Sequence, residues 1–275
     1  MNNQFVIEIG RLHSEVQAKK PIIHHLTNYV TVNDCANIVL ALGASPIMAD
    51  DIEEVEDITA ISSALVLNIG TLNQRTITSM LAAGKKANQC NIPVILDPVG
   101  AGASQLRNQT IARLLDQIQI SILRGNMSEI RFISGSDAST QGVDASERDI
   151  ANAGQTGMET AARLASKLNC VVAITGATDL ISDGKRSLYI QNGHPLLSKV
   201  TGTGCMSTSL VGGFAGVTSD YFIAASAGIM CMGIAGEIAF HAVGSKGTGS
   251  FHAAIIDNIS MLNDQTIAEM AKIHE

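Results

Sequence analysis

The clearest potential for chemistry lies in residues 201–210, which read TGTGCMSTSL. Gly202 and Gly204 carry no Cβ, so the backbone there can turn sharply and approach a ligand closely. The apolar run that follows predicts a helix, whose N-terminus offers unpaired N–H groups and the positive end of its dipole to an anion. Cys205 would lie in the first turn, where the pKa of a thiol is lowered. An anion site beside a polarisable sulfur predicts phosphoryl or acyl transfer. The alternative interpretation is an ordinary glycine-rich helix start, in which Cys205 is a small buried hydrophobic residue without a chemical role.

The length allows one large domain or two small ones, and we expect a single domain that spans residues 1–275. Of its 275 residues, 46% are hydrophobic and 16% are charged, which is enough for one large core. The net charge of −7 and the lack of a basic run argue against nucleic acid as a partner. The low charge and the positive mean hydropathy indicate that some apolar surface is buried between subunits.

Other features argue against a membrane or a secretory compartment. Residues 205–244 contain too many glycine and polar residues for the roughly 18 uncharged apolar residues of a membrane span. The N-terminus lacks the basic and apolar regions of a signal peptide. Five cysteines without a C-x-x-C pair indicate reduced thiols of the cytoplasm, not disulfides or a zinc site. The adjacent His24 and His25 point to opposite sides of a strand, so no histidine metal site is expected.

The order of elements predicts a parallel sheet with helices on both faces. Short runs rich in Val, Ile and Leu alternate with segments of helical spacing, and this alternation is typical of α/β proteins. The predicted strands are residues 64–70, 92–97, 120–123 and 170–175, and the predicted helices between them are residues 73–90 and 104–118.

The remaining segments complete this layout. Residues 135–157 are rich in Ser, Asp, Gln and Gly and predict a loop or a frayed connection. A D-G turn within residues 179–192 predicts a hairpin that adds an antiparallel edge to the sheet. From residue 220 onward the chain is expected to be mostly helical, over residues 224–241 and 251–274.

The ends of the four predicted strands share one character, since each is polar or glycine-rich. Parallel sheets bind ligands beyond the carboxyl ends of their strands, so these residues are expected to form one polar rim. The rim residues are Asn68, Asp97, Arg124 and Thr175, each followed within three residues by glycine.

Several motifs together resemble hydroxyethylthiazole kinase, a family of the ribokinase-like superfamily. The resemblance covers nearly the whole chain in the expected order, with small departures at Thr248, where proline is expected, and in residues 135–157. The motifs are HLTNYV at 25–30, ALGASPIM at 41–48, DPVGA at 97–101, RGNMSEI at 124–130, TGTGC at 201–205 and GSFH at 249–252.

This resemblance implies an activity, a fold and an assembly. The activity is ATP-dependent transfer of the γ-phosphoryl group to the alcohol of 4-methyl-5-(2-hydroxyethyl)thiazole, in thiamine salvage. The fold is a three-layer α/β sandwich with a central, mostly parallel sheet. The assembly is a homotrimer with the thiazole site between neighbouring subunits. Burial of apolar surface between the subunits would account for the low charge and the positive mean hydropathy.

The resemblance also implies catalytic roles for the glycine-rich turn. Backbone N–H groups of Gly202, Thr203 and Gly204 would bind the transferring phosphoryl group. Cys205 would lie next to the substrate hydroxyl, at a position where related sugar and pyrimidine kinases carry an aspartate base. We expect Cys205 to position the hydroxyl and to accept its proton late, without becoming a covalent nucleophile.

The nucleotide and Mg²⁺ are assigned to the rim. Arg124, Thr175 and Asn126 match positions that contact ATP, and Glu129 and Asp97 would hold Mg²⁺ through water. Asn126 and Glu129 also fit a capping box, and Asp97 also fits an ordinary turn. A surface arginine remains the alternative for Arg124.

The acceptor site is assigned mainly by the resemblance. Asn28, Met48 and Gly202 match positions that meet the thiazole, whose ring a methionine sulfur contacts favourably. His25 and His252 are expected at the rim of the site. The purine would be lined by apolar residues near 228–241 and 252–259, which fit a helical core equally well.

Three alternatives remain open at this point. One is another small-alcohol kinase of the same superfamily, for hydroxymethylpyrimidine or a sugar, against which Cys205 argues. Another is the ATP- or ADP-dependent dehydratase of hydrated nicotinamide cofactors, which shares the fold and needs no acceptor alcohol. A regulatory nucleotide-binding module would be expected to have lost residues of the anion site, and these are all present.

Overall fold

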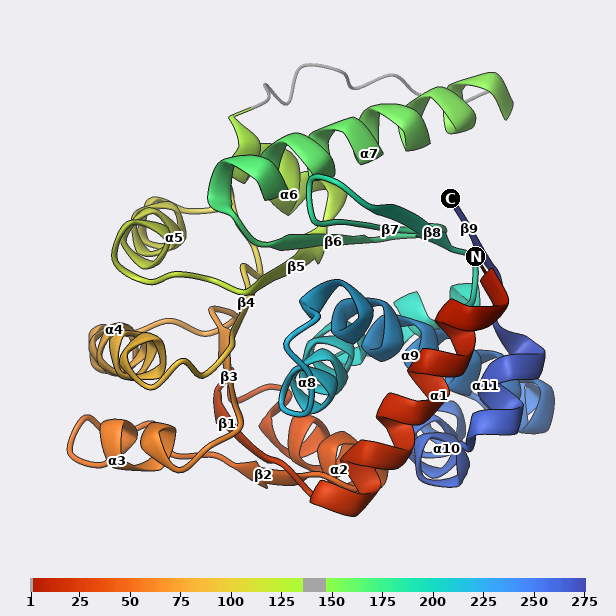
Figure 1. The fold of residues 1–275 in the computed structure, drawn as a ribbon, viewed down its shortest axis with the longest axis horizontal. Coiled ribbons are helices and arrows are strands. Elements are labelled where there is room, and N and C mark those ends of the chain that lie inside the picture. Colours follow the sequence, from red (N-terminus) through yellow and green to blue (C-terminus); the bar gives the residue numbers. More distant parts are fainter. Residues whose placement is uncertain (1, 136–146) are drawn as a thin grey trace.

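A computed structural model describes residues 2–135 and 147–275 as helices packed on both faces of one sheet (Figure 1). Within those residues nine strands pair in the order β2-β1-β3-β4-β5-β6-β7-β8-β9. The strands are β1 Ile22–Leu26, β2 Ser45–Ile47, β3 Ala64–Asn68, β4 Val94–Asp97, β5 Ile122–Asn126, β6 Val171–Thr175, β7 Asp179–Ser182, β8 Ser187–Ile190 and β9 Ile273–His274.

The strands from β2 to β6 are parallel, and those from β6 to β9 are antiparallel. The parallel strands β3, β4 and β6 are almost wholly buried, because their runs of Val, Ile and Leu face helices on both sides. The pairing aligns the polar strand ends: Asn68 lies opposite Asp97, and Asn126 lies opposite Thr175. The predicted rim is therefore one edge of the sheet.

The helices form two outer layers, each over its own hydrophobic core. On one face lie α3 Val55–Ala60, α4 Gln74–Gln89, α5 Gln105–Gln117, α6 Met127–Ser134 and α7 Glu147–Leu168 (Figure 1). On the other lie α1 Asn2–Lys19, α2 Val32–Leu42, α8 Thr203–Ala215, α9 Tyr221–Val243, α10 Thr248–Met261 and α11 Asp264–Met270, with the short 3-10 helices η1 Pro195–Lys199 and η2 Gly244–Lys246.

The four predicted strands, the two helices between them and the hairpin are confirmed, with small shifts at their ends. The loop predicted for residues 135–157 is wrong from Glu147 onward, where α7 begins, and residues 136–146 lie outside the described residues. Residues 251–274 are not one helix. The Asn263 side chain caps a new helix by accepting from Thr266 N, and β9 then pairs with β8 as the edge strand in place of the hairpin.

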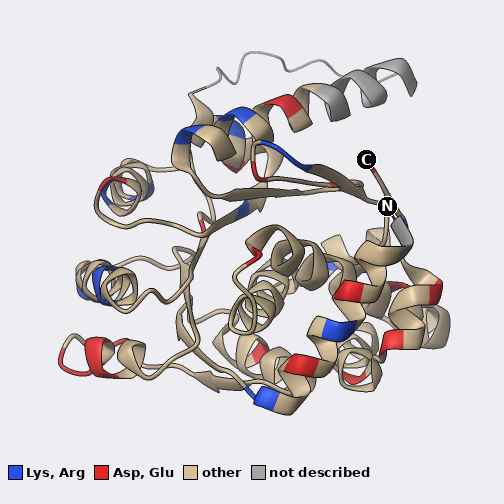
Figure 2. Ribbon diagram, viewed as in Figure 1, with Lys and Arg blue, Asp and Glu red and all other residues tan. Residues whose placement is uncertain are grey.

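Helix α9 is the most apolar element of the fold. Residues 221–246 have the length and hydropathy of a membrane span, contrary to the sequence expectation, because glycine and serine lower the hydropathy only slightly. However, 83% of the apolar window is buried against the rest of the protein, chiefly α8 and α10. Figure 2 shows that α8 and α9 are nearly free of charged residues, as expected for central core helices.

Candidate active site

The glycine-rich turn ends at the N-terminus of α8, as predicted. Gly202 is the capping residue and has φ of 90°, a left-handed conformation that glycine adopts without strain. A Cβ at Gly202 would lie 3.0 Å from Thr31 Cγ2. Because glycine has no side chain to cap the helix, the N–H groups of the first turn remain available to an anion.

Gly204 does not make the sharp turn predicted for it. It is part of the α8 helix. A Cβ at this position would lie 2.9 Å from Arg124 Nη1. Glycine at 204 therefore leaves room for the Arg124 guanidinium to reach the start of the helix.

Cys205 lies at the centre of a polar network at the rim. Its Sγ accepts hydrogen bonds from Asn28 Nδ2 at 3.4 Å and from Asn68 Nδ2 at 3.3 Å. Burial raises the pKa of the thiol, and the nearby Asp97 carboxylate raises it further. The predicted lowering by the helix terminus is wrong, since desolvation of the thiolate outweighs the helix dipole here.

Asn28 and Asn68 connect three strand ends. Asn28 Nδ2 donates to Asn68 Oδ1 at 3.0 Å, and Asn28 Oδ1 accepts from the backbone of Val30 and Thr31 at 3.1 Å each. Asn68 Nδ2 then donates to Asp97 Oδ2 at 2.9 Å. Asn68 stood among the predicted rim residues but was given no role, and the structure places its amide between Cys205 and Asp97.

Asp97 is buried with one oxygen occupied and one free. Its Oδ2 accepts from Asn68 and from Thr208 Oγ1 at 2.8 Å and lies 3.8 Å from Arg124 Nη1. Its Oδ1 is buried without a hydrogen-bond partner. Burial raises the pKa of Asp97 to about 6, against the opposing effect of Arg124. A buried acceptor without a partner is costly, which suits a site that a further ligand completes.

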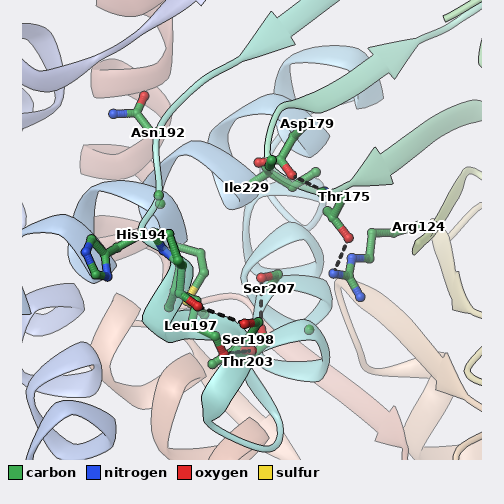
Figure 3. Close-up of a pocket in the computed structure, with 17 residues that line it drawn as sticks. Arg124, Thr175, Asp179, Asn192, His194, Leu197, Ser198, Thr203, Ser207 and Ile229 are labelled. Atoms are coloured by element: carbon green, nitrogen blue, oxygen red, sulfur yellow. Dashed lines mark hydrogen bonds between the residues drawn. The ribbon is translucent and has the colours of Figure 1, made fainter. Parts of the chain in front are cut away.

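Arg124 is buried at the rim and is not a surface arginine. Its Nη2 donates to Thr175 Oγ1 at 2.6 Å, while its Nε has no partner (Figure 3). The guanidinium thus lies between β5, β6 and the start of α8, with N–H groups to spare for a phosphate.

Asn126 and Glu129 form the predicted capping box. Asn126 Oδ1 accepts from Glu129 N at 3.0 Å, and Glu129 Oε2 accepts from Asn126 N at 2.8 Å. The other carboxylate oxygen of Glu129 accepts from Gly100 N at 2.8 Å. Both oxygens are therefore in use, and over the described chain no three His, Cys, Asp or Glu side chains cluster as a metal site.

Arg107 is a residue that the sequence did not single out. From α5 it donates to the carbonyl oxygens of Ile69, Gly70 and Val99, so it joins the loops that follow β3 and β4. These loops carry the residues next to Asn68 and Asp97. No sequence pattern distinguishes Arg107 from the other charged residues of an amphipathic helix.

A cavity of about 580 Å³ opens beside the start of α8 (Figure 3). Arg124, Thr175, Thr203 and Gly204 lie at one part of its wall, and Ile229, Met232 and Gly233 of α9 form an apolar part. Of the residues expected to line the purine pocket, these three of 228–241 line this cavity, and none of 252–259, which lie in α10, does.

The two predicted rim histidines differ. His25 is fully buried, with Nδ1 3.0 Å from Ile23 O and Nε2 3.1 Å from Ser209 Oγ, so its placement at the rim is wrong. Burial lowers the pKa of His25 to about 4. His252 Nε2 lies 3.2 Å from Asp34 Oδ1. The other oxygen, Asp34 Oδ2, would lie 3.3 Å from a Cβ placed on Gly202. His252 is therefore connected to the glycine-rich turn through Asp34.

His24 bonds Thr59 of α3 on the opposite face of the sheet from His25, as the strand geometry predicted. Met48 directly follows β2 and is half-buried. It therefore lies at the same edge of the sheet as Asn28 but two strands away from Asn68. Among the described residues, no hydrogen bond joins Met48 to Cys205, Asn28 or Asn68.

The burial of Asp179 leads us to predict that the stability of the protein depends on pH. It is buried in the cavity wall, and burial raises its pKa to about 7 although Gly176 N donates to it at 2.9 Å. A carboxyl with a raised pKa contributes stability that is present below about pH 3.9 and lost as the pH rises through about 7. Asp179→Asn keeps the Gly176 bond, so we expect its free energy of unfolding at pH 8.5 to exceed that of the wild type by about 1–3 kcal/mol and its unfolding temperature to be higher.

This difference should shrink toward pH 5 in thermal unfolding curves. The exposed Asp257 offers a matched control, since the Asp257→Asn variant and the wild type should melt at the same temperature at both pH values. Equal melting of Asp179→Asn and the wild type at pH 8.5 would contradict the expected ionisation.

The fold and the site together define a class of protein. A mostly parallel sheet whose carboxyl edge carries a glycine-led helix N-terminus and a buried arginine is an α/β fold with an anion-binding edge. The solved structure of an ADP complex of Bacillus subtilis pyridoxal kinase shares this fold, with a TM-score of 0.56 and 16% identity over 78% of this chain and 90% of that one.

Closer relatives narrow the class. The hydroxyethylthiazole kinase family model matches residues 13–265. A hydroxyethylthiazole kinase of Clostridium beijerinckii is 63% identical over the full length of both chains. The structure of hydroxyethylthiazole kinase from Pyrococcus horikoshii OT3 superimposes with a TM-score of 0.88 at 36% identity, covering 97% of this chain and 98% of that one. The chain belongs to the hydroxyethylthiazole kinase family.

Proposed function

We propose that this chain catalyses ATP-dependent phosphorylation of 4-methyl-5-(2-hydroxyethyl)thiazole at its hydroxyl group, a step of thiamine salvage, and that residues 1–275 act as one kinase domain. The observation that carries the proposal is the free N-terminus of α8, with Cys205 on one side and the Arg124 guanidinium on the other. Full-length similarity to hydroxyethylthiazole kinases supports this choice of acceptor.

The nucleotide fits the cavity beside α8. We assign its phosphates to Arg124, Thr175 and Asn126 and its base to the apolar wall formed by Ile229 and Met232. Phosphoryl transfer passes through a loose transition state, so the protein contributes mainly alignment and neutralisation of charge. The backbone N–H groups of residues 202–204 would stabilise the transferring group as its oxygens gain charge.

The donor set fits a hydrated Mg²⁺. Asp97 Oδ1 is a buried acceptor without a partner, and the described residues provide no closed cage of carboxylates. Mg²⁺ keeps several waters and binds through few protein oxygens together with substrate phosphates. Asp97 would hold such an ion, and Glu129, whose two oxygens already accept from backbone N–H groups, would act through water. When bound, the ion supplies positive charge to the phosphate oxygens.

Cys205 would act as a hydroxyl-positioning group and as a late proton acceptor. Its raised pKa keeps most of the thiol neutral near pH 7, and in its thiolate form Sγ would accept a hydrogen bond from the substrate hydroxyl before transfer. As the bond from the alcohol oxygen to phosphorus forms and the bond to the ADP oxygen breaks, the alcohol proton passes to the sulfur. The thiolate thereby becomes a neutral thiol, and the hydrogen bonds that Asn28 and Asn68 already donate to Sγ would stabilise the thiolate before the transfer.

This role predicts that Cys205→Asp retains substantial activity. A carboxylate can accept the same hydrogen bonds and is a stronger base than a neutral thiol at neutral pH. Because the thiol pKa is raised, wild-type kcat should rise with pH above 7, whereas kcat of Cys205→Asp should be level there. Steady-state kinetics from pH 6 to 9 test both points. Complete inactivation of folded Cys205→Asp would count against the role.

The acceptor and the assembly are assigned together. We place the thiazole near Cys205, with Gly202, Asn28 and Met48 around it. We propose a cytoplasmic homotrimer in which a neighbouring subunit completes this site. Tyr29 and Val30 support a covering partner, since these large side chains beside Asn28 are 79% and 58% exposed. Light scattering coupled to size exclusion measures the assembly, and a fully active monomer would contradict it.

One assay separates the candidate functions. ADP release by the purified protein with Mg-ATP is compared with the thiazole alcohol, with hydroxymethylpyrimidine and with no acceptor. Release that depends on the thiazole alcohol supports the proposal. Release with the pyrimidine alone would overturn the acceptor and favour the pyrimidine kinase. No release from a folded, nucleotide-binding protein would favour the nicotinamide-hydrate dehydratase or a regulatory module.

A further inference from the structure

Helix α9 contains one acidic side chain in an otherwise apolar core helix. Glu237 is 8% exposed, and the other residues of Tyr221–Val243 carry no Asp, Glu, Lys or Arg. A buried carboxylate is costly unless it is paired and hydrogen-bonded, so its partners indicate what it is for.

The partners of Glu237 lie in the cavity wall and in the C-terminal segment. Its Oε1 accepts from Gly193 N at 2.8 Å and from Asn192 Nδ2 at 3.2 Å. Its Oε2 accepts from Lys272 Nζ at 2.7 Å. Asn192 and Gly193 line the same cavity as Arg124 and Thr175 (Figure 3).

The C-terminal segment is attached to the same loop. Asn192 Nδ2 donates to Met270 O, Lys272 N donates to Asn192 Oδ1, and Gln191 N donates to Lys272 O, each at 2.8 Å. Every polar atom of the Asn192 side chain is thus used within the protein. The loop packs closely against α9, because a Cβ at Gly233 would lie only 2.7 Å from Asn192.

We propose that Glu237, together with Lys272, is a positioning residue that fixes the 191–194 loop as a wall of the nucleotide site. The C-terminal segment thereby becomes a part of that site although it lies far from the phosphate-binding residues in sequence. Glu237 does not touch the nucleotide, because its oxygens are already engaged by Asn192, Gly193 and Lys272. This inference rests on the proposed use of the cavity for ATP.

Glu237→Gln is the direct test. A glutamine has the same shape, but its NH₂ group must face either the Gly193 and Asn192 donors or the Lys272 ammonium, so one set of bonds is lost. We expect KM for ATP to rise about tenfold, which corresponds to one charge-assisted hydrogen bond. The kcat at saturating ATP and KM for the thiazole should stay within about twofold, since the turn at residues 202–205 is not touched.

Lys272 provides a second variant in case Glu237→Gln does not fold. Lys272 is half-exposed, so Lys272→Met should fold and raise KM for ATP, and Lys272→Arg should restore most of the wild-type value. Lys246→Met changes an exposed lysine in η2 and should leave all parameters unchanged. An unchanged KM for ATP in folded Glu237→Gln or Lys272→Met, or an equal change in the KM of both substrates, overturns the proposal.

Calorimetric binding of ATP separates this inference from the proposed function. If the wild type binds ATP without phosphorylating the thiazole, the proposed function fails, and weaker ATP binding by the Lys272→Met protein still supports the positioning role. If the wild type and both variants bind ATP equally well, the positioning role fails whatever the reaction is.

Discussion

Replacing Arg124 by lysine should lower kcat/KM by about 10²–10³-fold, the loss that follows removal of one well-placed donor to a transition state. Lysine keeps the positive charge next to Asp97 but lacks the planar fork of N–H groups. In the structure that fork reaches Thr175 with one nitrogen and approaches Asp97 and Gly204 with the other. One ammonium group cannot serve all three directions and a phosphate as well.

The measurement is steady-state kinetics with both substrates varied, beside thermal unfolding of the same samples. Because the charge is kept, Asp97 remains paired and the melting temperature should change little. Arg113→Lys changes an exposed arginine of α5 and serves as the control. If Arg124→Lys retained wild-type kcat/KM, the assignment of Arg124 to the phosphates would be wrong.

Gly204→Ala should separate activity from stability. The new methyl group would lie 2.9 Å from Arg124 Nη1, at the far end of a flexible side chain, so the guanidinium can retreat at little cost to folding. Alanine is also the better helix former by about 0.5–1 kcal/mol. We therefore expect an unchanged or higher melting temperature together with a fall in kcat/KM of about tenfold or more, since a displacement of about 1 Å can cost 10²-fold.

Gly249→Ala is a closely matched control. Gly249 is the second residue of α10 and follows Thr248, as Gly204 is the second residue of α8 and follows Thr203. Both helices begin after a glycine of positive φ, but a Cβ at Gly249 would meet nothing within 4 Å. Gly249→Ala should keep full activity. Equal activity of the two variants would show that space for Arg124 at position 204 is unimportant.

Much of the architecture could be predicted from the sequence because it depends on local patterns. The β-branched runs that end at Asn68 and Asp97 predicted parallel strands, and the observed register places these two residues opposite each other. The Gly202 motif predicted a helix start, and Asn126 with Glu129 predicted a capping box. Spacing along the chain is sufficient for such features, since the interacting atoms are few residues apart.

The errors arose where burial and distant residues decide the chemistry. The pKa of Cys205 is raised because the sulfur is buried beside Asp97, which is 108 positions away in the sequence. The role of Gly204 depends on Arg124, and His25 is buried because α8 covers it through Ser209. No local pattern carries these effects.

The sequence by itself determined the order of the elements, the polar edge of the sheet and the glycine-led helix start. Only the tertiary structure decided which of these groups meet, and it gave Arg107 and Glu237 their contacts with loops from other parts of the chain. The physical reason is the sequence separation over which each interaction acts. Backbone conformation and capping depend on neighbours in sequence, whereas desolvation and hydrogen bonds between elements exist only after the chain has folded.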